Sequence, residues 1–293
     1  MNKITIEEST CKKCNLCIEV CPNKIISREK DKISAIANKI NACFKCGQCM
    51  AICPSKSILV RGLSYDNDFF ALPDNKNYEN EFFNLIYSRR AVRNFQNRPV
   101  PKELLEKIVK AISFAPPGFP PIKTEIIVVS DPDIIKKALP HMIELYDTLV
   151  VAVKNPIMKF VIKREVGKQK FKTMQNHLIP LLKSRLPELK KGIEDTLTRY
   201  APSMILFHAD RNGEDIKEDI FIASTYGMLA AHSLGLGGSI MDIIPPAIDR
   251  NRELRTLFNI PESNQVISSI IIGYPKYKYQ RGIKRNLKSI KWL

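Results

Sequence analysis

Several features that this sequence lacks exclude classes of protein before any motif is considered. No run of about 18 or more apolar residues occurs in the 293-residue chain, so no segment is expected to span a bilayer. The chain start has no apolar stretch typical of a secretion signal. Histidine occurs at only four positions, and none has a partner at a spacing that indicates a metal site. Cysteine is absent beyond residue 53, so thiol–metal chemistry is confined to the N-terminal segment.

The eight cysteines form two copies of one pattern. The first copy is Cys11-x-x-Cys14-x-x-Cys17-x-x-x-Cys21-Pro22, and the second, 32 residues later, is Cys43-x-x-Cys46-x-x-Cys49-x-x-x-Cys53-Pro54. This spacing is typical of [4Fe–4S] binding, and where two runs occur the fourth cysteine of each binds the other run's cluster. We therefore assign one cluster to Cys11, Cys14, Cys17 and Cys53, and the other to Cys21, Cys43, Cys46 and Cys49.

Zinc and disulfides are the two alternatives for these cysteines. A zinc site favours two cysteine pairs separated by a longer loop, and a disulfide framework is typical of short secreted chains. Tight triplets in a chain of 293 residues fit neither alternative. Thiols kept for metal, with no secretion signal and no membrane span, favour a cytoplasmic location.

Residues 1–62 resemble the two-cluster bacterial ferredoxin domain, on all eight cysteines and both prolines. Each run is followed by a similar apolar stretch, at 25–28 and at 58–61, so each half is expected to form a short strand and a turn. The resemblance implies a low-potential electron relay. A domain this small buries little apolar surface, so its clusters are expected to supply part of its stability.

The rest of the chain is expected to form a linker and a second domain. Residues 63–80 are rich in Asn and Asp and lack helical periodicity, which indicates a linker. Within 81–293, helices are predicted over 81–90, from Pro101 to Pro116–Pro117, over 133–152, over 157–198 with breaks near Pro180 and Pro187, and over 215–234. Strands are predicted over 126–129, 204–208 and 266–272. Helices and strands mix without regular βαβ alternation, so the fold class is α+β.

Four segments of the second domain resemble, in order and spacing, the FMN-dependent nitroreductase family. They are Ser88-Arg-Arg-Ala-Val-Arg-Asn-Phe95, Phe114-Ala-Pro-Pro-Gly118, Ala230-Ala-His-Ser-Leu-Gly-Leu-Gly-Gly238 and Ile272-Gly-Tyr-Pro275. The resemblance covers about residues 82–290. It implies FMN as cofactor and a homodimer with the flavin at the interface. It implies no catalytic side-chain acid or base, and we assign none.

The resemblance also implies which residues bind the flavin. A flavin phosphate is a dianion, which guanidinium groups bind well. Basic residues near the start and end of the domain are expected at the phosphate, and a turn and a backbone stretch are expected beside the ring. The candidates are Arg89, Arg90, Ala91, Arg93, Pro116, Pro117, Gly118, Met241, Asp242, Ile243, Arg281, Lys284 and Arg285.

Several features around these candidates leave more than one interpretation open. The two basic groups are also compatible with an ordinary helix start and a basic tail. Gly235, Gly237 and Gly238 are expected both to end a helix and to allow close backbone approach. The chain departs from the family at Ala91, where a serine is common, and at 119–122, where Phe-Pro-Pro-Ile replaces the usual asparagine and glutamine. Those two amide contacts are therefore not expected here.

The formal net charge of +16 falls to about +12 if each of two clusters adds about −2. Much of the excess lies in 154–191, with eleven Lys or Arg, and in 276–291, with seven. These segments are compatible with a solvated surface, an acidic redox partner, a phosphate or nucleic acid. No nucleic-acid motif supports the last option, so nucleic acid is not an expected partner.

The expected function is electron transfer from two [4Fe–4S] clusters to FMN and on to an organic acceptor, such as a nitroaromatic, a quinone or another flavin. The expected electron donor is a ferredoxin-like protein or NAD(P)H. One alternative is a different reductive or dehydrogenating flavoenzyme on the same scaffold, such as a reductive dehalogenase. Another is a non-catalytic electron-transfer protein.

Overall fold

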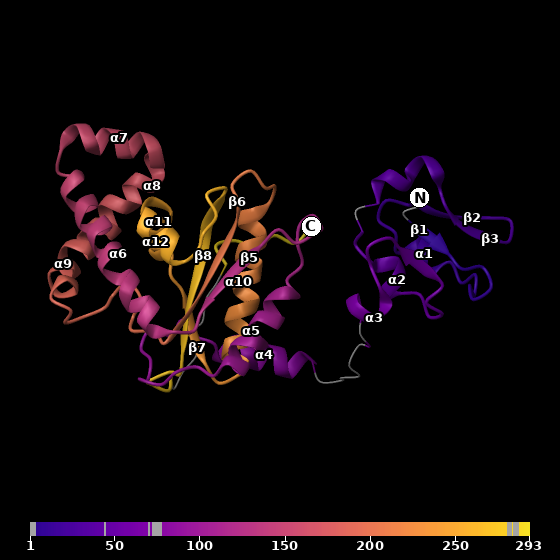
Figure 1. Cartoon of the computed structure of the whole chain (residues 1–293), viewed down its shortest axis with the longest axis horizontal. Helices are drawn as coiled ribbons and strands as arrows, with labels where there is room; N and C mark the ends of the chain where they lie inside the picture. The colour runs from indigo at the N-terminus through magenta and orange to yellow at the C-terminus, as the bar shows by residue number, and fades with distance from the viewer. Residues whose placement is uncertain (1–3, 44, 70, 72–77, 280–282, 284–286) are drawn as a thin grey trace. The chain divides into compact units, whose positions relative to one another are not determined.

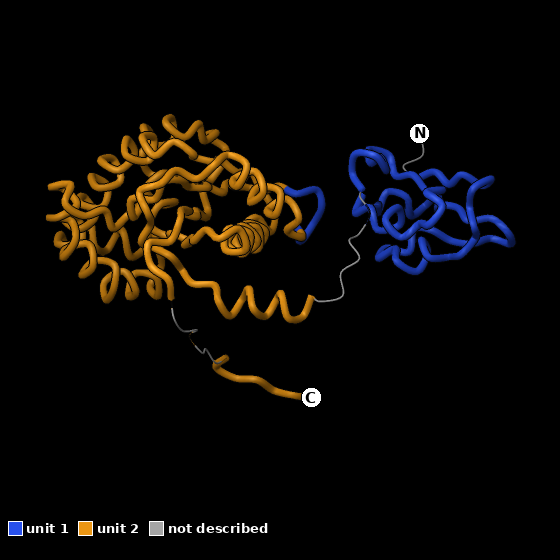
Figure 2. Tube along the Cα trace, turned by 90° about the horizontal axis from the view of Figure 1, so that it is seen from below, with its two compact units in different colours: residues 1–77, 117–122 blue, residues 78–116, 123–293 orange. Residues whose placement is uncertain are grey.

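The computed structural model describes residues 4–43, 45–69, 71, 78–279, 283 and 287–293. The chain divides into two compact units, coloured separately in Figure 2. Unit 1 consists of residues 1–77 and 117–122, and unit 2 of residues 78–116 and 123–293. Each unit is described by itself.

Unit 1 repeats its backbone as it repeats its cysteines. Helix α1 (Leu16–Glu19) begins within the first cysteine triplet, and helix α2 (Gln48–Ala51) begins 32 residues later, within the second. The residue before each helix is left-handed, with φ of 66° at Asn15 and 74° at Gly47. Strand β1 (Ile4–Ile6) pairs with β4 (Ile58–Val60), and β2 (Ile26–Glu29) pairs with β3 (Lys32–Ala35), which leads to the 3-10 helix η1 (Ala37–Ala42). Both apolar stretches after the cysteine runs are therefore strands, as predicted.

The start of the predicted linker is folded in the structure. Helix α3 (Tyr65–Asp68) lies within 63–80, and Leu63, Tyr65 and Phe69 pack against the buried cluster of unit 1. The Tyr65 hydroxyl donates hydrogen bonds toward the carbonyls of Ile58 (3.0 Å) and Met50 (3.3 Å). The polar composition of this segment concealed these apolar contacts, because they are spaced irregularly rather than at a helical period.

A four-stranded antiparallel sheet forms the centre of unit 2. Its order is β5 (Glu125–Val129), β6 (Ser203–Asp210), β8 (Asn264–Gly273) and β7 (Gly237–Ile240). Successive side chains of a strand point to opposite faces. On β6, Met204 and Leu206 accordingly pack into one buried cluster, and Ile205 and Phe207 into another.

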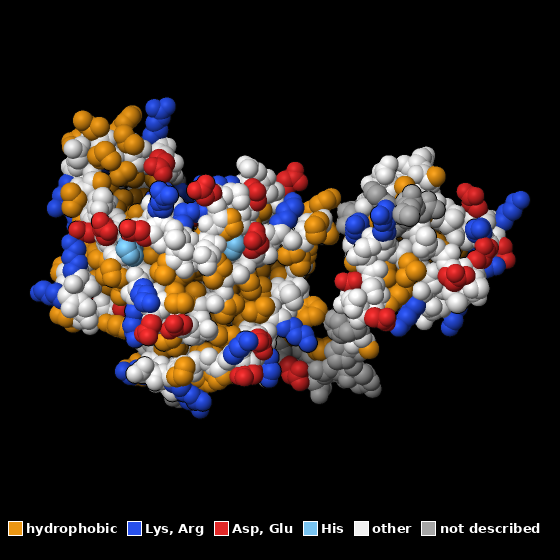
Figure 3. Space-filling view, in the orientation of Figure 1, with side chains coloured by type: hydrophobic (Ala, Val, Ile, Leu, Met, Phe, Trp, Pro, Cys, Tyr) orange, Lys and Arg blue, Asp and Glu red, His pale blue; other side chains and the backbone are white. Residues whose placement is uncertain are grey.

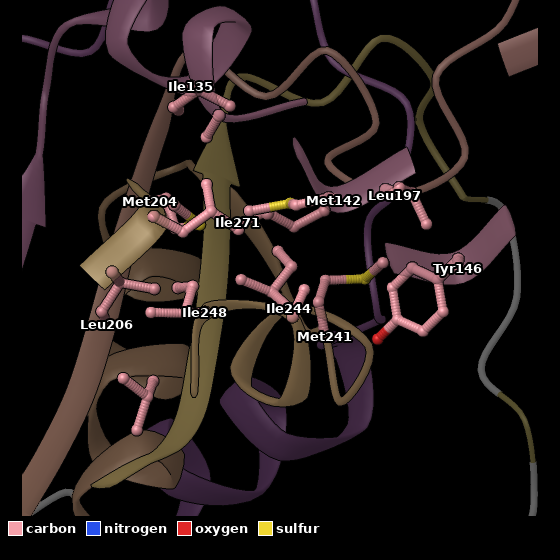
Figure 4. Close-up of a cluster of buried hydrophobic side chains, with 14 of the residues drawn as sticks. Ile135, Met142, Tyr146, Leu197, Met204, Leu206, Met241, Ile244, Ile248 and Ile271 are labelled. Atoms are coloured by element: carbon pink, nitrogen blue, oxygen red, sulfur yellow. The ribbon is translucent and has the colours of Figure 1, made fainter. Parts of the chain in front are cut away.

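Helices cover both faces of this sheet (Figure 1). On one face lie α5 (Lys102–Ser113) and α10 (Ile216–Ser233), and on the other α6 (Pro132–Ala152), α9 (Ile179–Lys190), α11 (Ile244–Arg250) and α12 (Arg252–Leu257). Figure 4 shows the second face, where Met142 of α6 lies beside Ile271 of β8 and Tyr146 of α6 lies beside Met241. The mixed helices and antiparallel strands confirm the predicted α+β class.

Several helix bounds differ from the prediction. Helix α4 spans Tyr78–Ser88 rather than 81–90. The region 157–198 contains α7 (Pro156–Val166), α8 (Lys168–Thr173), a π-helix (Met174–Leu178) and α9, and it leaves helix after Lys190. The main break lies at Gly167, whose φ is 83°. The strand β7 and the helices α11 and α12 have no counterpart in the prediction.

The prediction of a break at Pro187 was wrong, because this proline lies inside α9. An interior proline costs about 3 kcal/mol. Four side chains of α9 are buried on its packed face, at Ile179, Leu182, Leu186 and Leu189. Burial of each contributes roughly 1.5–3 kcal/mol, which outweighs the cost of the proline. Pro180 lies in the first turn, where its missing N–H breaks no helical hydrogen bond of α9.

No helix in the described parts of the chain is long and apolar enough to cross a membrane.

Candidate functional site

Two hollows in unit 1 are lined by cysteines, four in each. A hollow of about 320 Å³ is lined by Cys11, Cys14, Cys17 and Cys53. A second, of about 370 Å³, is lined by Cys21, Cys43, Cys46 and Cys49. Both volumes include space open to solvent. Each hollow therefore combines the first three cysteines of one run with the last cysteine of the other.

Each hollow offers an all-cysteine set of possible ligands. All eight cysteines are free thiols. Among the described residues, no group of three or more His, Cys, Asp or Glu side chains is arranged to hold one metal ion. In an iron–sulfur cube, four thiolates each bind their own iron. A set of four cysteines is compatible with such a cube.

One thiol of each set, Cys17 in one and Cys49 in the other, is a poor thiolate without a metal. Burial raises the pKa of Cys17, and the nearby Cys11 and Cys53 raise it further. Burial likewise raises the pKa of Cys49 to about 11, with Cys46 as the next cause. Clustered thiolates repel one another in a partly buried site, and bound iron offsets that repulsion. The sites are therefore built for a positively charged core.

The last cysteine of each run accepts a hydrogen bond from the backbone four residues later. The Ile25 N–H lies 3.4 Å from the Cys21 sulfur, and the Ser57 N–H lies 3.4 Å from the Cys53 sulfur. The Ser55 hydroxyl adds a contact of 3.8 Å to Cys53. Burial acts to raise the pKa of Cys53, but these hydrogen bonds outweigh it and lower the pKa on balance.

Unit 2 brings three of its four family-like segments together beside β7. Ala91 forms a β-bridge with Gly238, and the Val92 N–H donates to the Gly238 carbonyl at 3.0 Å. The Gln96 N–H donates to the Tyr274 carbonyl at 2.9 Å, just beyond β8. Segments 88–95, 230–238 and 272–275 are thus neighbours in space, although about 180 residues separate the first from the last.

The glycines of segment 230–238 serve both predicted purposes. Gly235 has a φ of 76° and donates to the His232 carbonyl at 3.1 Å, and Leu236 donates to the Ala231 carbonyl at 2.9 Å. This is a Schellman end to α10. A Cβ built on Gly237 would lie 2.5 Å from the side chain of Val92, so close approach of the 88–95 segment requires glycine there.

The arginines near this junction include one that sequence reasoning missed. The Arg90 guanidinium donates to the carbonyls of Arg89 (2.8 Å) and Tyr87 (3.2 Å), at the end of α4. Its Nε is buried without a hydrogen-bond partner among the described residues, and so is the Nε of Arg199. Burial lowers the pKa of Arg199, and the charge of Arg93 is the next cause. Guanidinium groups whose buried Nε has no partner among the described residues fit an anionic ligand.

Arg199 lies in no recognisable motif, but the structure holds it firmly. Its backbone is left-handed, with a φ of 60°. The buried carboxylate of Asp195 accepts hydrogen bonds from the backbone N–H groups of Leu197 (3.0 Å), Thr198 (2.8 Å) and Tyr200 (2.9 Å). This turn directs the chain into β6. An Asp eight residues before the buried strand β6 was the only signal in the sequence.

The stretch 241–243 is fixed by hydrogen bonds from two sides. The Met241 N–H donates to the Ser269 carbonyl at 3.0 Å, and the Ser269 hydroxyl donates to the Met241 carbonyl at 2.9 Å. The Tyr146 hydroxyl donates to the Ile243 carbonyl, and burial raises the pKa of Tyr146. The Met241 N–H is engaged in this way, so the N–H groups of Asp242 and Ile243 are the ones that could serve a ligand.

Five candidate residues lie outside the described part of unit 2. Pro116 belongs to unit 2, but Pro117 and Gly118 belong to the segment 117–122 of unit 1. Arg281, Lys284 and Arg285 lie outside the described residues. One histidine does lie beside the arginine segment: His232 Nε2 is 2.8 Å from the Ser88 hydroxyl. Burial lowers the pKa of His232, and Arg89 and Arg90 lower it further.

A model of the nitroreductase family matches residues 86–274, most of unit 2 and more than half of the chain. The chain belongs to the nitroreductase family. A model of the 4Fe-4S dicluster domain matches residues 3–77. These matches confirm the prediction of a ferredoxin-type domain joined to a nitroreductase domain, and with it the oxidoreductase class.

Known relatives agree with this membership. A Methanothermobacter thermautotrophicus protein provisionally named NADH dehydrogenase/NAD(P)H nitroreductase is 27% identical over 206 residues, which are 69% of this chain and 81% of the relative. An iodotyrosine deiodinase of Nematostella vectensis is 26% identical over 205 residues, 67% of each chain. A Bacteroides fragilis nitroreductase, solved with bound FMN, aligns with a TM-score of 0.55 at 16% identity and covers 73% of this chain and 98% of its own. The last likeness shows a shared fold.

Proposed function

We propose that this nitroreductase-family protein is an iron–sulfur flavoenzyme, which passes electrons from two [4Fe–4S] clusters in unit 1 to FMN in unit 2 and on to a small organic acceptor. The observation that carries the proposal is the presence, in one chain, of two four-cysteine hollows and of three convergent family-like segments. The clusters supply single-electron transfer, and FMN accepts electrons singly or in pairs.

The residues that would hold FMN form two groups in unit 2. Arg89, Arg90 and Arg93, with Arg199 beside Arg93, would meet the phosphate or other anionic parts of the flavin. The rigid turn Met241–Ile243 would donate backbone hydrogen bonds to the ring edge. Pro116–Gly118 and the cluster Arg281, Lys284 and Arg285 stay predictions for the same site.

We also propose a homodimer. Helix α7 carries apolar side chains that face solvent in one chain, including Ile157 (74% exposed) and Phe160 (67% exposed). Figure 3 shows apolar side chains gathered over this helix. Exposed apolar surface of this kind is typical of an interface. A second copy of the chain would cover it.

The names of the relatives, which include an NAD(P)H nitroreductase, support a nitro compound as acceptor and NAD(P)H as donor. A nitroaromatic, a quinone or another flavin is the first candidate acceptor, with a ferredoxin-like protein or NAD(P)H as donor. The similarity to iodotyrosine deiodinase favours a second candidate, reductive removal of halide from a phenolic substrate.

The first test is anaerobic purification with iron, sulfide and flavin measured. We expect about eight irons and about one FMN per chain. The loaded protein would then be assayed with nitroaromatic, quinone and halogenated phenol acceptors, using reduced ferredoxin or NAD(P)H. Cys11→Ser and Cys43→Ser, which alter one cysteine set each, should slow ferredoxin-driven turnover. Unchanged turnover in variants that fold and retain FMN would rule out the relay.

Arg199 gives a separate test of the flavin site. Removing a charged hydrogen-bond donor costs about 1.5–3 kcal/mol, so Arg199→Ala should weaken FMN affinity by about tenfold or more. Fluorescence titration of the deflavinated protein measures this constant. The exposed Lys107, on α5, gives a matched control in Lys107→Ala, which should leave FMN affinity unchanged. Equal affinities in both variants would remove Arg199 from the site.

A further inference from the structure

The two cysteine hollows are not equivalent, and the difference lies in hydroxyl groups. We propose that Ser55 and Ser57 raise the reduction potential of the cluster at Cys53 above that of the cluster at Cys21, so that electrons come to rest on the Cys53 cluster. This inference rests on the two clusters of the proposed function. It concerns which of them is the stronger acceptor.

A chain of hydroxyl groups leads to the Cys53 sulfur. The Thr10 hydroxyl donates to the Ser57 hydroxyl at 3.0 Å, and the Ser57 and Ser55 hydroxyls lie 2.7 Å apart. The Ser55 hydroxyl lies 3.8 Å from the sulfur. Ser57 is only 2% exposed, so its hydroxyl depends on protein partners rather than on water.

The direction of these hydrogen bonds follows from the two ends of the chain. A thiolate bound to iron has no proton and can only accept. Because Thr10 donates to Ser57, the Ser57 proton is directed to Ser55, and the Ser55 proton to the sulfur. The Ser57 N–H, 3.4 Å from the same sulfur, adds a second donor. Donors linked in this way polarise one another.

The equivalent positions of the first run lack this arrangement. Thirty-two residues before Ser55 and Ser57 stand Asn23 and Ile25. Ile25 has no hydroxyl and contributes only its N–H to Cys21, at 3.4 Å. The Asn23 side-chain amide donates to the Ala42 carbonyl at 2.7 Å, away from the sulfur.

The charged residues that line the two hollows do not explain a difference in reduction potential between the clusters. One lysine lines each hollow, Lys12 at the Cys53 set and Lys45 at the Cys21 set. Apolar side chains border both hollows, but of the two described linings only that of the Cys53 set contains hydroxyl groups, those of Ser55 and Ser57.

The sign of the effect follows from charge. Reduction adds one negative charge to a cluster, and part of it resides on the sulfurs. A hydrogen-bond donor stabilises the more negative form more strongly, so donors to a ligand sulfur raise the potential. We expect loss of the Ser55 hydroxyl to change the reduction equilibrium of the Cys53 cluster by about tenfold, which corresponds to about 59 mV for one electron.

The test is an anaerobic redox titration of the full-length loaded protein, followed by EPR. Ser55→Ala should lower the potential of one cluster by about 59 mV and leave the other unchanged. The matched control is Asn23→Ala, at the equivalent repeat position, which should move neither potential. Cys14→Ala alters the EPR signal of the Cys53 set and so identifies which signal belongs to it. Ser55→Thr keeps a hydroxyl and should retain the original potential.

The outcomes separate this inference from the proposed function. Less than about eight irons, or a single cluster signal, would contradict the two-cluster proposal itself. Full iron with two equal potentials, or with potentials unmoved by Ser55→Ala, would overturn only the inference. If Ser55→Ala does not load iron, Ser57→Ala tests the same chain one link earlier and should lower the same potential.

Discussion

Units 1 and 2 are held together by different means. In unit 1, β1 and β4 have three residues each and α1 and α2 four each, and the buried cluster has nine members, two of them cysteines. In unit 2, β6 has eight residues and β8 ten, with buried clusters of 23 and 16 members on the two faces. Short elements with a small core gain little from apolar burial. The difference indicates that unit 1 depends on what its cysteines bind, whereas unit 2 depends on its sheet.

Removing iron tests this contrast with the largest expected effect. Chelation of the loaded protein should unfold unit 1 and leave unit 2 folded, because metal-binding free energy is folding free energy in so small a domain. Hydrogen exchange followed by mass spectrometry would show loss of protection over residues 4–69 and retained protection in β6 and β8. Retained protection in both units would contradict the comparison.

Phe207→Ala should destabilise unit 2 and leave unit 1 folded. Phe207 is fully buried on β6, and truncation of such a residue costs about 3–5 kcal/mol. We expect the urea midpoint of unit 2 to fall and the visible spectrum of the clusters to persist. The partly exposed Phe221 of α10 supplies the matched control, since Phe221→Ala should lower the urea midpoint much less than Phe207→Ala does. A simultaneous loss of the cluster absorbance would mean that the units do not unfold independently.

Gly237→Ala tests the contact that brings the arginine segment to β7. The added Cβ would lie 2.5 Å from Val92, and overpacking of this kind costs about 1–3 kcal/mol. We expect reduced stability in urea and weaker FMN binding, both recovered in the double variant with Val92→Ala. Gly235→Ala is the comparison, because nothing lies within 4 Å of its added Cβ and only its φ of 76° is strained. A double variant no better than the single one would disprove the Val92 clash.

The pH dependence of unit 2 gives the smallest effect. Burial lowers the pKa of His208 from its usual value, and its Nδ1 lies 2.8 Å from the Asn264 side-chain amide, which donates to the neutral ring. The unfolded chain therefore binds a proton that the folded chain resists, so this stability is present above pH 6.5 or so and is lost as pH falls below it. Urea midpoints should fall from pH 7.5 to pH 6.

His208→Gln isolates the contribution of His208 to the pH dependence of stability, because glutamine does not titrate. Its urea midpoint should depend less on pH over the same window, with a residual slope from His232, whose pKa is also lowered. A slope equal to that of the unaltered protein would assign the pH dependence to other groups.

Local patterns predicted most of the regular elements and the chemical class. Each of these patterns can be recognised from a few neighbouring residues. They are the cysteine runs, the apolar runs at 126–129, 204–208 and 266–272, and the helical spacing of apolar residues in α5. The strand Gly237–Ile240 could not be predicted from its sequence, because two of its four residues are glycines and its burial comes from pairing with β8. The predicted break at Pro187 is absent for a related reason. Burial of one face of α9 outweighs the tendency of this proline to end a helix.

The sequence by itself determined the spacing of eight cysteines in two runs, and with it an N-terminal 4Fe-4S domain and a C-terminal nitroreductase domain. Only the tertiary structure decided which distant residues meet: Val92 against Gly237, Arg199 beside Arg93, and the Ser55 hydroxyl at the Cys53 sulfur. The physical reason is that spacing records the needs of one segment, such as a metal's ligands or a strand's buried face. Contacts across the fold arise from shape and hydrogen bonding between segments, which no local pattern contains.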